Sequence, residues 1–241
     1  MNQYDKSRPE SIQAMFGSIA LGYDLANAIL SFNLHRYWNA KLIRSVLRQT
    51  KGSRYLDLCC GTGDIAFGYL KKTKNPTQAT LLDFCPEMLE CARLKEKRLS
   101  LSSHSIHYTQ GNAEALPMPA NSFDCATMAY GIRNISNPLK SLQEAHRVLV
   151  KGGIFGILEL TEPTNTLARK GHNFYLHKAL PLLGKWVTSN QCAYEYLCRS
   201  IQNFIPPEKL ESLLIEAGCN ETSKISLCLG TATLLLAKKC G

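Results

Sequence analysis

The chain has 241 residues, of which 45% are hydrophobic and 20% charged, and its formal net charge is +9 at pH 7. This balance is typical of a folded globular protein, and the length favours a single domain over residues 1–241. No apolar run approaches the roughly 18–20 residues of a membrane-spanning helix. The polar N-terminus lacks the apolar core of a secretion signal, so we expect a cytoplasmic protein.

Ten cysteines are spread through the sequence without any Cys-x-x-Cys pair. This spacing gives no support to a zinc ribbon or a thioredoxin-type redox pair, and no metal site is predicted. Most of the cysteines have apolar neighbours, as Cys125 does in "FDCATMAY". We interpret them as reduced residues that fill the core of an intracellular protein.

The first fifty residues precede any strand pattern. Apolar residues from Ile12 to Leu47 recur with helical spacing in two pieces, interrupted near "LSFNLHRYW". We therefore expect residues 1–50 to form an N-terminal helical cap.

Strand patterns and helical patterns then alternate along the chain. The predicted strands are 53–59, 77–84, 105–111, 122–130 and 153–160. The predicted helices are 64–72, 86–99, 137–150 (ending at Gly152-Gly153) and 206–218. Residues 163–205 form a helical insertion before the last helix, and residues 223–229 and 232–239 favour a terminal antiparallel pair. This alternation predicts an α/β fold built on a doubly wound, mostly parallel sheet.

The stretch "RYLDLCCGTGD" places a glycine loop at the end of the first predicted strand, where such sheets bind ligands. Gly61, Gly63 and Ala66 satisfy the pattern G-x-G-x-x-G/A, and Asp83 follows twenty residues after Gly63. Taken alone, this is the fingerprint of a dinucleotide site.

The charges beside the loop argue against a dinucleotide. A pyrophosphate would lie at the N-terminus of the helix that begins near Asp64, with Asp57 close by. A like-charge pair at ~4 Å costs about 4 kcal/mol at an effective dielectric constant near 20. S-adenosylmethionine has no phosphate, and its sulfonium and ammonium groups attract acids. The alternative for Asp57 and Asp64 is a structural role in capping and loop formation.

Two further strand ends complete this interpretation. Asp83, after the second strand, can accept hydrogen bonds from both ribose hydroxyls. Asn112 and Ala113 in "GNAEALP" follow the third strand, where an adenine would lie. The alternative for Asn112 and Ala113 is a loop that only turns the chain.

Several longer segments together resemble the ubiquinone/menaquinone biosynthesis C-methyltransferases. They are "YDLANAILSFNLHRYW", "LDLCCGTGD", "GNAEALP", "GIRN", "EAHRVLVKGG" and "LPLLG", and the resemblance runs from about Phe16 to Ala217. It implies a class I S-adenosylmethionine-dependent methyltransferase with a Rossmann-like, seven-stranded sheet whose last strand is antiparallel. It also implies methylation of a ring carbon of a polyprenylated quinol.

The resemblance implies cofactor contacts at Thr62, Asp83, Asn112 and Ala113. The complete set that we expect at the cofactor site is Asp57, Gly61, Thr62, Gly63, Asp83, Phe84, Asn112, Ala113 and Ala129. Family members often have serine at the position of Ala129, so only its backbone remains for a contact. The C-terminal "GTATLLLAKKCG" also lacks the histidine that is usual in the family.

Catalysis is expected from residues at the rim of the sheet and in the cap. Carbon methylation of a quinol requires a phenolate-like oxygen beside the reacting carbon. We expect Arg133 in "YGIRN" to stabilise that charge and Asn134 to orient the oxygen. Tyr23 is expected to hydrogen-bond the quinol, and His35 is a candidate base whose alternative is a structural role. The alternative for Arg133 is a bridge between loop carbonyls.

The positive charge concentrates in a window, Pro163 to Tyr194, that contains no Asp or Glu. Its cations mix with aromatic residues such as Phe174 and Trp186, which suits peripheral contact of residues 167–190 with the inner face of an anionic membrane. The other interpretation is a helical roof over the substrate. Nucleic acid is not expected as a partner, and a homodimer stays open.

Three other functions compete with quinol methylation. They are a methyltransferase that acts on RNA, a non-catalytic module that binds S-adenosylmethionine, and a nicotinamide-dependent reductase, which the charge at Asp64 disfavours. Of the two quinols, we favour demethylmenaquinol because the short chain is close to the bacterial single-substrate pattern, and the ubiquinone precursor stays an alternative.

Overall fold

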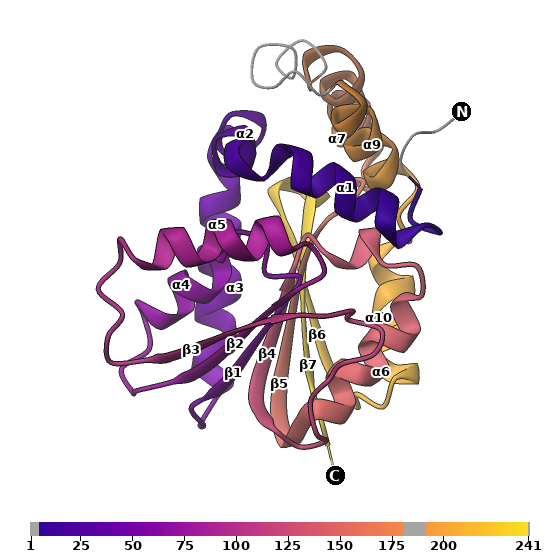
Figure 1. Ribbon diagram of the computed structural model, residues 1–241. Helices are drawn as coiled ribbons and strands as arrows, with labels where there is room; N and C mark the ends of the chain where they lie inside the picture. The colour runs from indigo at the N-terminus through magenta and orange to yellow at the C-terminus, as the bar shows by residue number, and fades with distance from the viewer. Residues whose placement is uncertain (1–4, 181–190, 241) are drawn as a thin grey trace.

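The computed structural model describes residues 5–180 and 191–240. A seven-stranded sheet runs through the molecule in the order β3-β2-β1-β4-β5-β7-β6 (Figure 1). The strands are β1 (Arg54–Leu58), β2 (Gln78–Asp83), β3 (Ser105–Gln110), β4 (Phe123–Ala129), β5 (Leu149–Leu160), β6 (Glu221–Leu227) and β7 (Ala232–Lys238). Only β7 is antiparallel to its neighbours, β5 and β6. The predicted α/β class, the mostly parallel sheet and the terminal antiparallel pair are confirmed.

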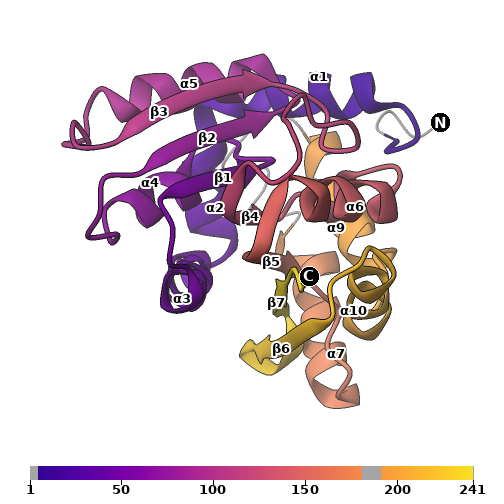
Figure 2. The same ribbon diagram turned by 90° about the horizontal axis from the view of Figure 1, so that it is seen from below.

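Helices cover both faces of this sheet. The α-helices are α1 (Pro9–Ile19), α2 (Tyr23–Leu30), α3 (Leu34–Gln49), α4 (Asp64–Leu70), α5 (Pro86–Glu96), α6 (Pro138–Val148), α7 (Thr166–Phe174), α9 (Gln191–Gln202) and α10 (Pro207–Glu216). Shorter helical turns are η1 (Ala20–Gly22), η2 (Ile132–Asn134), η3 (Tyr175–Ala179) and η4 (Cys228–Gly230). Helices α3, α4 and α5 lie on one face, and α6 and α10 lie on the other (Figure 2).

The core follows the two-residue alternation of the strands. In β1, Tyr55 points to the face of α3 and α4, whereas Leu56 and Leu58 point to the face of α6. Tyr55 stacks on Tyr69 of α4 with ring centroids 4.1 Å apart, and its hydroxyl lies 2.5 Å from that of Thr127. Both faces of the sheet are thus buried, which explains the near-continuous apolar runs of the central strands.

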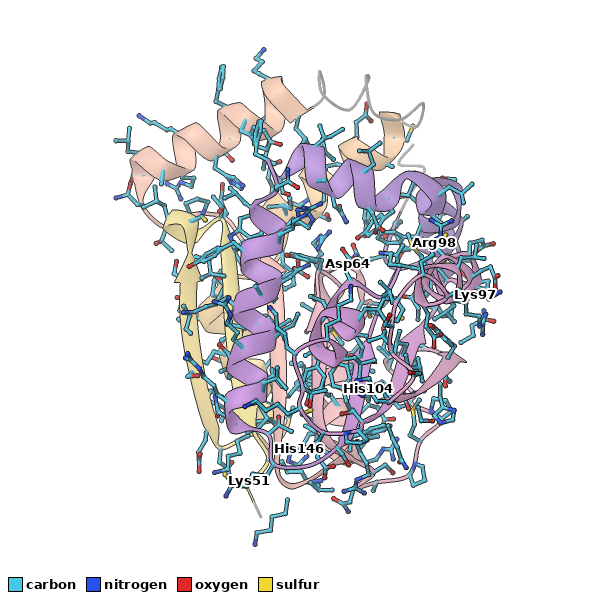
Figure 3. All side chains as sticks on the ribbon, turned by 90° about the vertical axis from the view of Figure 1, so that its left-hand side faces the viewer. Lys51, Asp64, Lys97, Arg98, His104 and His146 are labelled. Atoms are coloured by element: carbon cyan, nitrogen blue, oxygen red, sulfur yellow. The ribbon has the colours of Figure 1, made fainter. Side chains whose placement is uncertain are left out.

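The N-terminal segment divides at residues 31–33, inside the predicted interruption. Phe32 and Asn33 have φ angles of 50° and 60°, which turn the chain between α2 and α3. Helix α3 packs along the sheet beside β5, whereas α1 and α2 lie over the carboxyl ends of the strands. Figure 3 shows Asp64 at this covered end and His104 and His146 towards the opposite end. The covering part of the predicted cap is therefore α1 and α2.

The predicted end of the helix over 137–150, at Gly152-Gly153, was wrong. Helix α6 ends at Val148, and β5 begins at the next residue, so both glycines lie inside the strand. The pairing of β4 with β5 shifts register here, and Gly152, at φ 78°, donates its N–H to the carbonyl of Lys239. The glycines form a strand irregularity and not a helix stop.

The described part of the insertion packs on the cap. Leu176, Leu180, Cys198 and Ile201 form an apolar cluster with Ala26 and Leu30 of α2. No single helix among the described residues has the length and hydropathy of a membrane span. The helical segments 9–30 and 34–49 reach that length and hydropathy only when they are taken together, and the chain bends by 99° between them.

Candidate active site

The glycine loop connects β1 to α4 and is held by Asp83 at the end of β2. The carboxylate of Asp83 accepts the backbone N–H of Gly61 at 2.7 Å and that of Cys85 at 2.9 Å. Gly63 has φ 84°, and a Cβ atom there would lie 2.5 Å from the ring of Phe67. A side chain at this position would therefore clash as well as strain the backbone.

A pocket lies beside this loop at the carboxyl ends of the strands, and we call it the loop pocket. It brings together eight of the residues predicted for the site: Tyr23, Gly61, Asp83, Phe84, Asn112, Ala113, Ala129 and Asn134. The side-chain oxygen of Asn112 accepts the N–H of Glu114 at 2.8 Å, so Asn112 also turns its own loop. Both interpretations of "GNAEALP" are compatible with this geometry.

A second, smaller pocket, the inner pocket, continues from the same loop and includes Asp57, Thr62 and Asp64 in its lining. The Asp57 side chain is buried, and its Oδ1 accepts the hydroxyl of Thr127 at 2.6 Å. Its Oδ2 has no hydrogen-bond partner among the described residues. Burial raises the pKa of Asp57 to about 7, against the hydrogen bonds that lower it. The site therefore holds an acceptor atom that would be satisfied by a cationic donor.

Lys95 of α5 joins the cap to the glycine loop. Its Nζ lies 2.5 Å from Asp24 of α2, 2.6 Å from Asp64 and 3.0 Å from the hydroxyl of Thr62. Thr62 in turn donates its hydroxyl to Asp24 at 2.5 Å. We call these four residues the Lys95 cluster. Burial opposes the charge of Lys95, but Asp64 and Asp24 raise its pKa on balance. With two acids and one cation, the cluster keeps a net negative charge, which disfavours a phosphate here.

A large apolar cavity of about 470 Å³ opens between the cap, the described insertion and the η4 turn. Its walls include Leu30, Trp38, Leu160, Leu176, Leu197 and Ile201. Four residues line both this apolar cavity and the inner pocket: Tyr23, Asn27, His35 and Tyr130. Tyr23 also lines the loop pocket. The apolar cavity and the inner pocket therefore adjoin at these four residues, which we call the junction.

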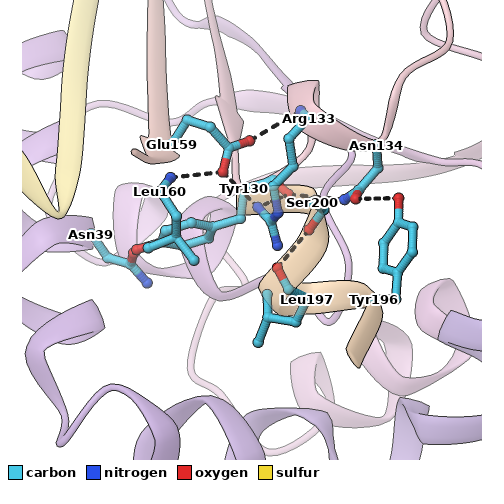
Figure 4. Close-up of polar contacts among 9 residues, drawn as sticks. All are labelled: Asn39, Tyr130, Arg133, Asn134, Glu159, Leu160, Tyr196, Leu197 and Ser200. Atoms are coloured by element: carbon cyan, nitrogen blue, oxygen red, sulfur yellow. Dashed lines mark hydrogen bonds and ion pairs between the residues drawn. The ribbon is translucent and has the colours of Figure 1, made fainter. Parts of the chain in front are cut away.

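Arg133 lies beside the junction in a network with Glu159 (Figure 4). Its Nη1 is 2.5 Å from Glu159 Oε1 and donates to the carbonyl of Tyr130 at 2.7 Å. The two charged side chains are only 6% and 1% exposed. Burial opposes the charge of Arg133, yet Glu159 raises its pKa on balance. Arg133 lines the apolar cavity and bonds a loop carbonyl, so the catalytic and the structural interpretation both retain support.

Asn134 extends the same network towards the insertion. Its amide donates to the carbonyl of Tyr130 at 3.2 Å and accepts the hydroxyl of Tyr196 of α9 at 2.9 Å. Asn134 lines the loop pocket, while Arg133 lines the apolar cavity. The turn "GIRN" thus places two neighbouring side chains on the two sides of the junction.

Sequence reasoning missed Lys95, Glu159 and Tyr130. Glu159 carries a recognisable signal, because it is an acid near the carboxyl end of an otherwise apolar strand. Lys95 has none, since it resembles any other cation on an amphipathic helix. His35, weighed as a candidate base, lies at the junction itself.

Known proteins resemble this chain over nearly its whole length. The sequence matches the ubiE/COQ5 methyltransferase family over residues 3–239. It is 52% identical over 239 residues to a demethylmenaquinone methyltransferase of Protochlamydia amoebophila, with 99% of each chain covered. It is 40% identical over 230 residues to a demethylmenaquinone methyltransferase of Chlamydia trachomatis serovar L2, with 95% of this chain and 96% of the relative covered.

A solved structure from Thermotoga maritima, described as a SAM-dependent methyltransferase, superposes with a TM-score of 0.60 at 18% identity. It covers 94% of this chain and 98% of its own, and at that identity it shows a common fold alone. The family match over nearly the whole sequence is stronger evidence, because it identifies the family as well as the fold. The chain belongs to the ubiE/COQ5 methyltransferase family.

Proposed function

We propose that this chain transfers a methyl group from S-adenosylmethionine to a ring carbon of a polyprenylated quinol, with demethylmenaquinol as its preferred acceptor. The observation that carries the proposal is the junction at Tyr23, Asn27, His35 and Tyr130, where the inner pocket, with its acids Asp57 and Asp64, adjoins a large apolar cavity. The named activity of the relatives in Protochlamydia and Chlamydia supports the choice of quinol.

The residues of the loop pocket and the inner pocket fit S-adenosylmethionine. The unpartnered Oδ2 of Asp57 suits the ammonium of its methionine part. Asp83 suits the ribose hydroxyls, while Asn112 and Ala113 suit the adenine edge, with Phe84 and the backbone of Ala129 in the same pocket. When bound, S-adenosylmethionine supplies an electrophilic methyl group on a sulfonium.

The acceptor requires a different environment, and the apolar cavity provides it. Its aliphatic lining suits a prenyl chain, and exclusion of water strengthens the electrostatic effect of the few polar groups present. Arg133 would stabilise negative charge on the quinol oxygen beside the reacting carbon. Asn134 would orient that oxygen, and Tyr23 would hydrogen-bond the ring from the cap.

Labelled S-adenosylmethionine tests this function against its alternatives. The acceptors are chemically reduced demethylmenaquinone, a reduced ubiquinone precursor and bulk RNA, each supplied at equal concentration. We expect label in methylated menaquinol, with a lower rate on the ubiquinone precursor. Label in RNA alone, or in no acceptor despite cofactor binding, would contradict the proposal and favour the RNA enzyme or the non-catalytic module.

We further propose that the mouth of the apolar cavity contacts an anionic membrane. Phe32, Leu34 and Leu229 line the cavity and are exposed, at 66%, 44% and 81%. The exposed Leu167 and Phe174 of α7 belong to the acid-free window. Lys185 and Trp186 of that window lie outside the described residues. This rim would let a lipid acceptor enter directly from the bilayer.

Replacing Phe32 and Leu229 by serine should weaken vesicle binding by about tenfold per side chain, since each would lose about 1.4 kcal/mol of apolar burial in lipid. Co-sedimentation with vesicles that contain phosphatidylglycerol measures the effect. The matched control is Ile215→Ser. Ile215 is 55% exposed on α10, a helix that packs on the sheet, and it does not line the apolar cavity. Equal losses in the control and the rim variants would show that the rim is not the contact.

A further inference from the structure

Among the described residues, only four line both the apolar cavity and the inner pocket: Tyr23, Asn27, His35 and Tyr130. A group that removes a proton from an acceptor at this junction has to be one of them or reach past them. Burial raises the pKa of Tyr23 and that of Tyr130, so both phenols stay protonated at neutral pH. Asn27 does not titrate. His35 is the remaining candidate.

The hydrogen bonds of Ser31 fix the tautomer of His35. The single hydroxyl proton of Ser31 is donated to the carbonyl of Asn27 at 2.6 Å. The Ser31 oxygen also lies 2.6 Å from His35 Nδ1, and it has no second proton to give. His35 Nδ1 must therefore carry the proton and donate it to Ser31. The other nitrogen, Nε2, is then a bare acceptor, and it has no hydrogen-bond partner among the described residues.

The surroundings of His35 keep its ring neutral. Burial lowers its pKa, and Arg36 on the same helix acts in the same direction. Asp64 of α4 and Asp24 of α2 oppose this effect, although both acids share the ammonium of Lys95. The other titratable or charged groups that line the same two compartments are Tyr23, Asp57, Cys59, Cys60, Tyr130, Arg133, His172, Tyr175 and Cys228. The net direction is a lowered pKa, so the unprotonated base is present at neutral pH.

From this geometry we infer that His35 is the general base of the reaction and that its Nε2 removes the proton from the quinol hydroxyl. The inference rests on the proposed function. The quinol O–H bond breaks, an N–H bond forms at Nε2, and the electron pair left on oxygen increases the electron density of the ortho carbon. When that carbon has gained the methyl group, the protonated His35 returns its proton to the oxygen. The neutral Nε2 then takes the hydrogen of the methylated carbon as a proton and releases it to solvent. One proton is released overall, because a sulfonium becomes a neutral thioether.

Arg133 and His35 then have separate tasks. Arg133 lines the cavity but not the inner pocket, and its charge is balanced by Glu159 at 2.5 Å. A guanidinium is protonated throughout the working pH range, so it stabilises an oxyanion better than it accepts a proton. His35 supplies the lone pair that Arg133 lacks.

His146 provides a matched control outside both compartments. It lies on α6, lines neither the apolar cavity nor the inner pocket, and burial lowers its pKa as well. If a lowered histidine pKa alone were enough, the two positions would be equally important. A base at the junction is important only at position 35.

The test compares His35→Gln, His35→Asn and His146→Gln with the wild type in the labelled-methyl assay. Loss of a general base costs about 10²–10⁴-fold, so we expect both His35 variants to lose at least ~100-fold in kcat. The KM for the quinol and the affinity for S-adenosylmethionine should stay within threefold, and added imidazole should restore part of the turnover. His146→Gln should stay within threefold of wild type.

The pH profile adds a readout that a structural role would not move. Wild-type kcat/KM should fall as the pH decreases through the pKa of His35, which lies below its usual 6.5. The fall occurs because the base becomes protonated there. In His35→Gln this acid limb should disappear.

Nitrogen NMR of histidine-labelled protein tests the tautomer without turnover. We expect His35 in the Nδ1–H form, and we expect Ser31→Ala to shift it towards the Nε2–H form. An Nε2–H tautomer in the wild type would overturn the inference. So would a folded His35→Gln that retains turnover, or one that changes only KM; in both cases methyl transfer itself would stand. Absence of quinol methylation by the wild type would instead overturn the proposed function, and the base with it.

Discussion

The substitution Asp83→Asn is expected to reduce the affinity for S-adenosylmethionine at least about 100-fold. The Asp83 carboxylate accepts the N–H groups of Gly61 and Cys85. In the proposed function it also accepts the ribose hydroxyls of the cofactor. An amide has one acceptor oxygen in place of two. Each hydrogen bond to a charged group contributes about 1.5–3 kcal/mol, and a buried donor left without a partner adds to the loss. Isothermal titration calorimetry gives the dissociation constants directly.

The matched control for this experiment is Glu90→Gln. It makes the same chemical change on α5, in a carboxylate that is 59% exposed and paired with Arg93. The control should bind the cofactor within twofold of wild type. Unchanged affinity in Asp83→Asn, with the protein folded, would show that the cofactor site does not depend on this carboxylate.

The second large effect is expected at Arg133. Arg133→Met should lower kcat by about 10²–10³, the usual loss when one group that stabilises an oxyanion is removed. It should also lower the free energy of unfolding by about 3–5 kcal/mol, because Glu159 would remain buried without its partner. The affinity for S-adenosylmethionine should stay unchanged. Denaturant unfolding and single-turnover kinetics measure the two effects separately.

A double variant separates the catalytic role of Arg133 from its structural one. Arg133→Met combined with Glu159→Gln removes both charges, and the glutamine oxygen can still accept a backbone N–H from Arg133 or Leu160 at this turn. We expect this double variant to recover much of the lost free energy of unfolding without recovering turnover. A double variant that turns over within tenfold of wild type would identify Arg133 as a structural bridge.

The sheet and the glycine loop were predictable because their signals are local. Apolar runs of strand length recur at regular spacing, and Gly61, Gly63 and Asp83 stand at strand ends, where parallel sheets bind ligands. The error at Gly152-Gly153 has a physical reason. A glycine pair after a helical pattern looks the same whether it ends a helix or bends a strand. Here the hydrogen bond from Gly152 N–H to the carbonyl of Lys239 places the pair in the sheet.

The remainder of the site depends on contacts between distant segments. Lys95 meets Asp64 across 31 residues, and Arg133 meets Glu159 across 26. No helical or strand period connects such pairs, so their spacing in the sequence carries no information. The inferred role of His35 depends on one further contact, the hydrogen bond of Ser31 to the carbonyl of Asn27, which forms in the turn after α2.

The Lys95 cluster has a consequence for how the binding of the two substrates is coupled. Asp24 of α2 accepts the hydroxyl of Thr62 in the glycine loop and pairs with Lys95, and through Asn27 and Leu30 the same helix forms a wall of the apolar cavity. A movement of α2 that admits one substrate therefore alters the compartment of the other. Binding is then thermodynamically linked: the factor by which the cofactor raises quinol affinity is the factor by which the quinol retains the cofactor. The ammonium group of Lys95 would thus couple the binding of the cofactor to the binding of the quinol.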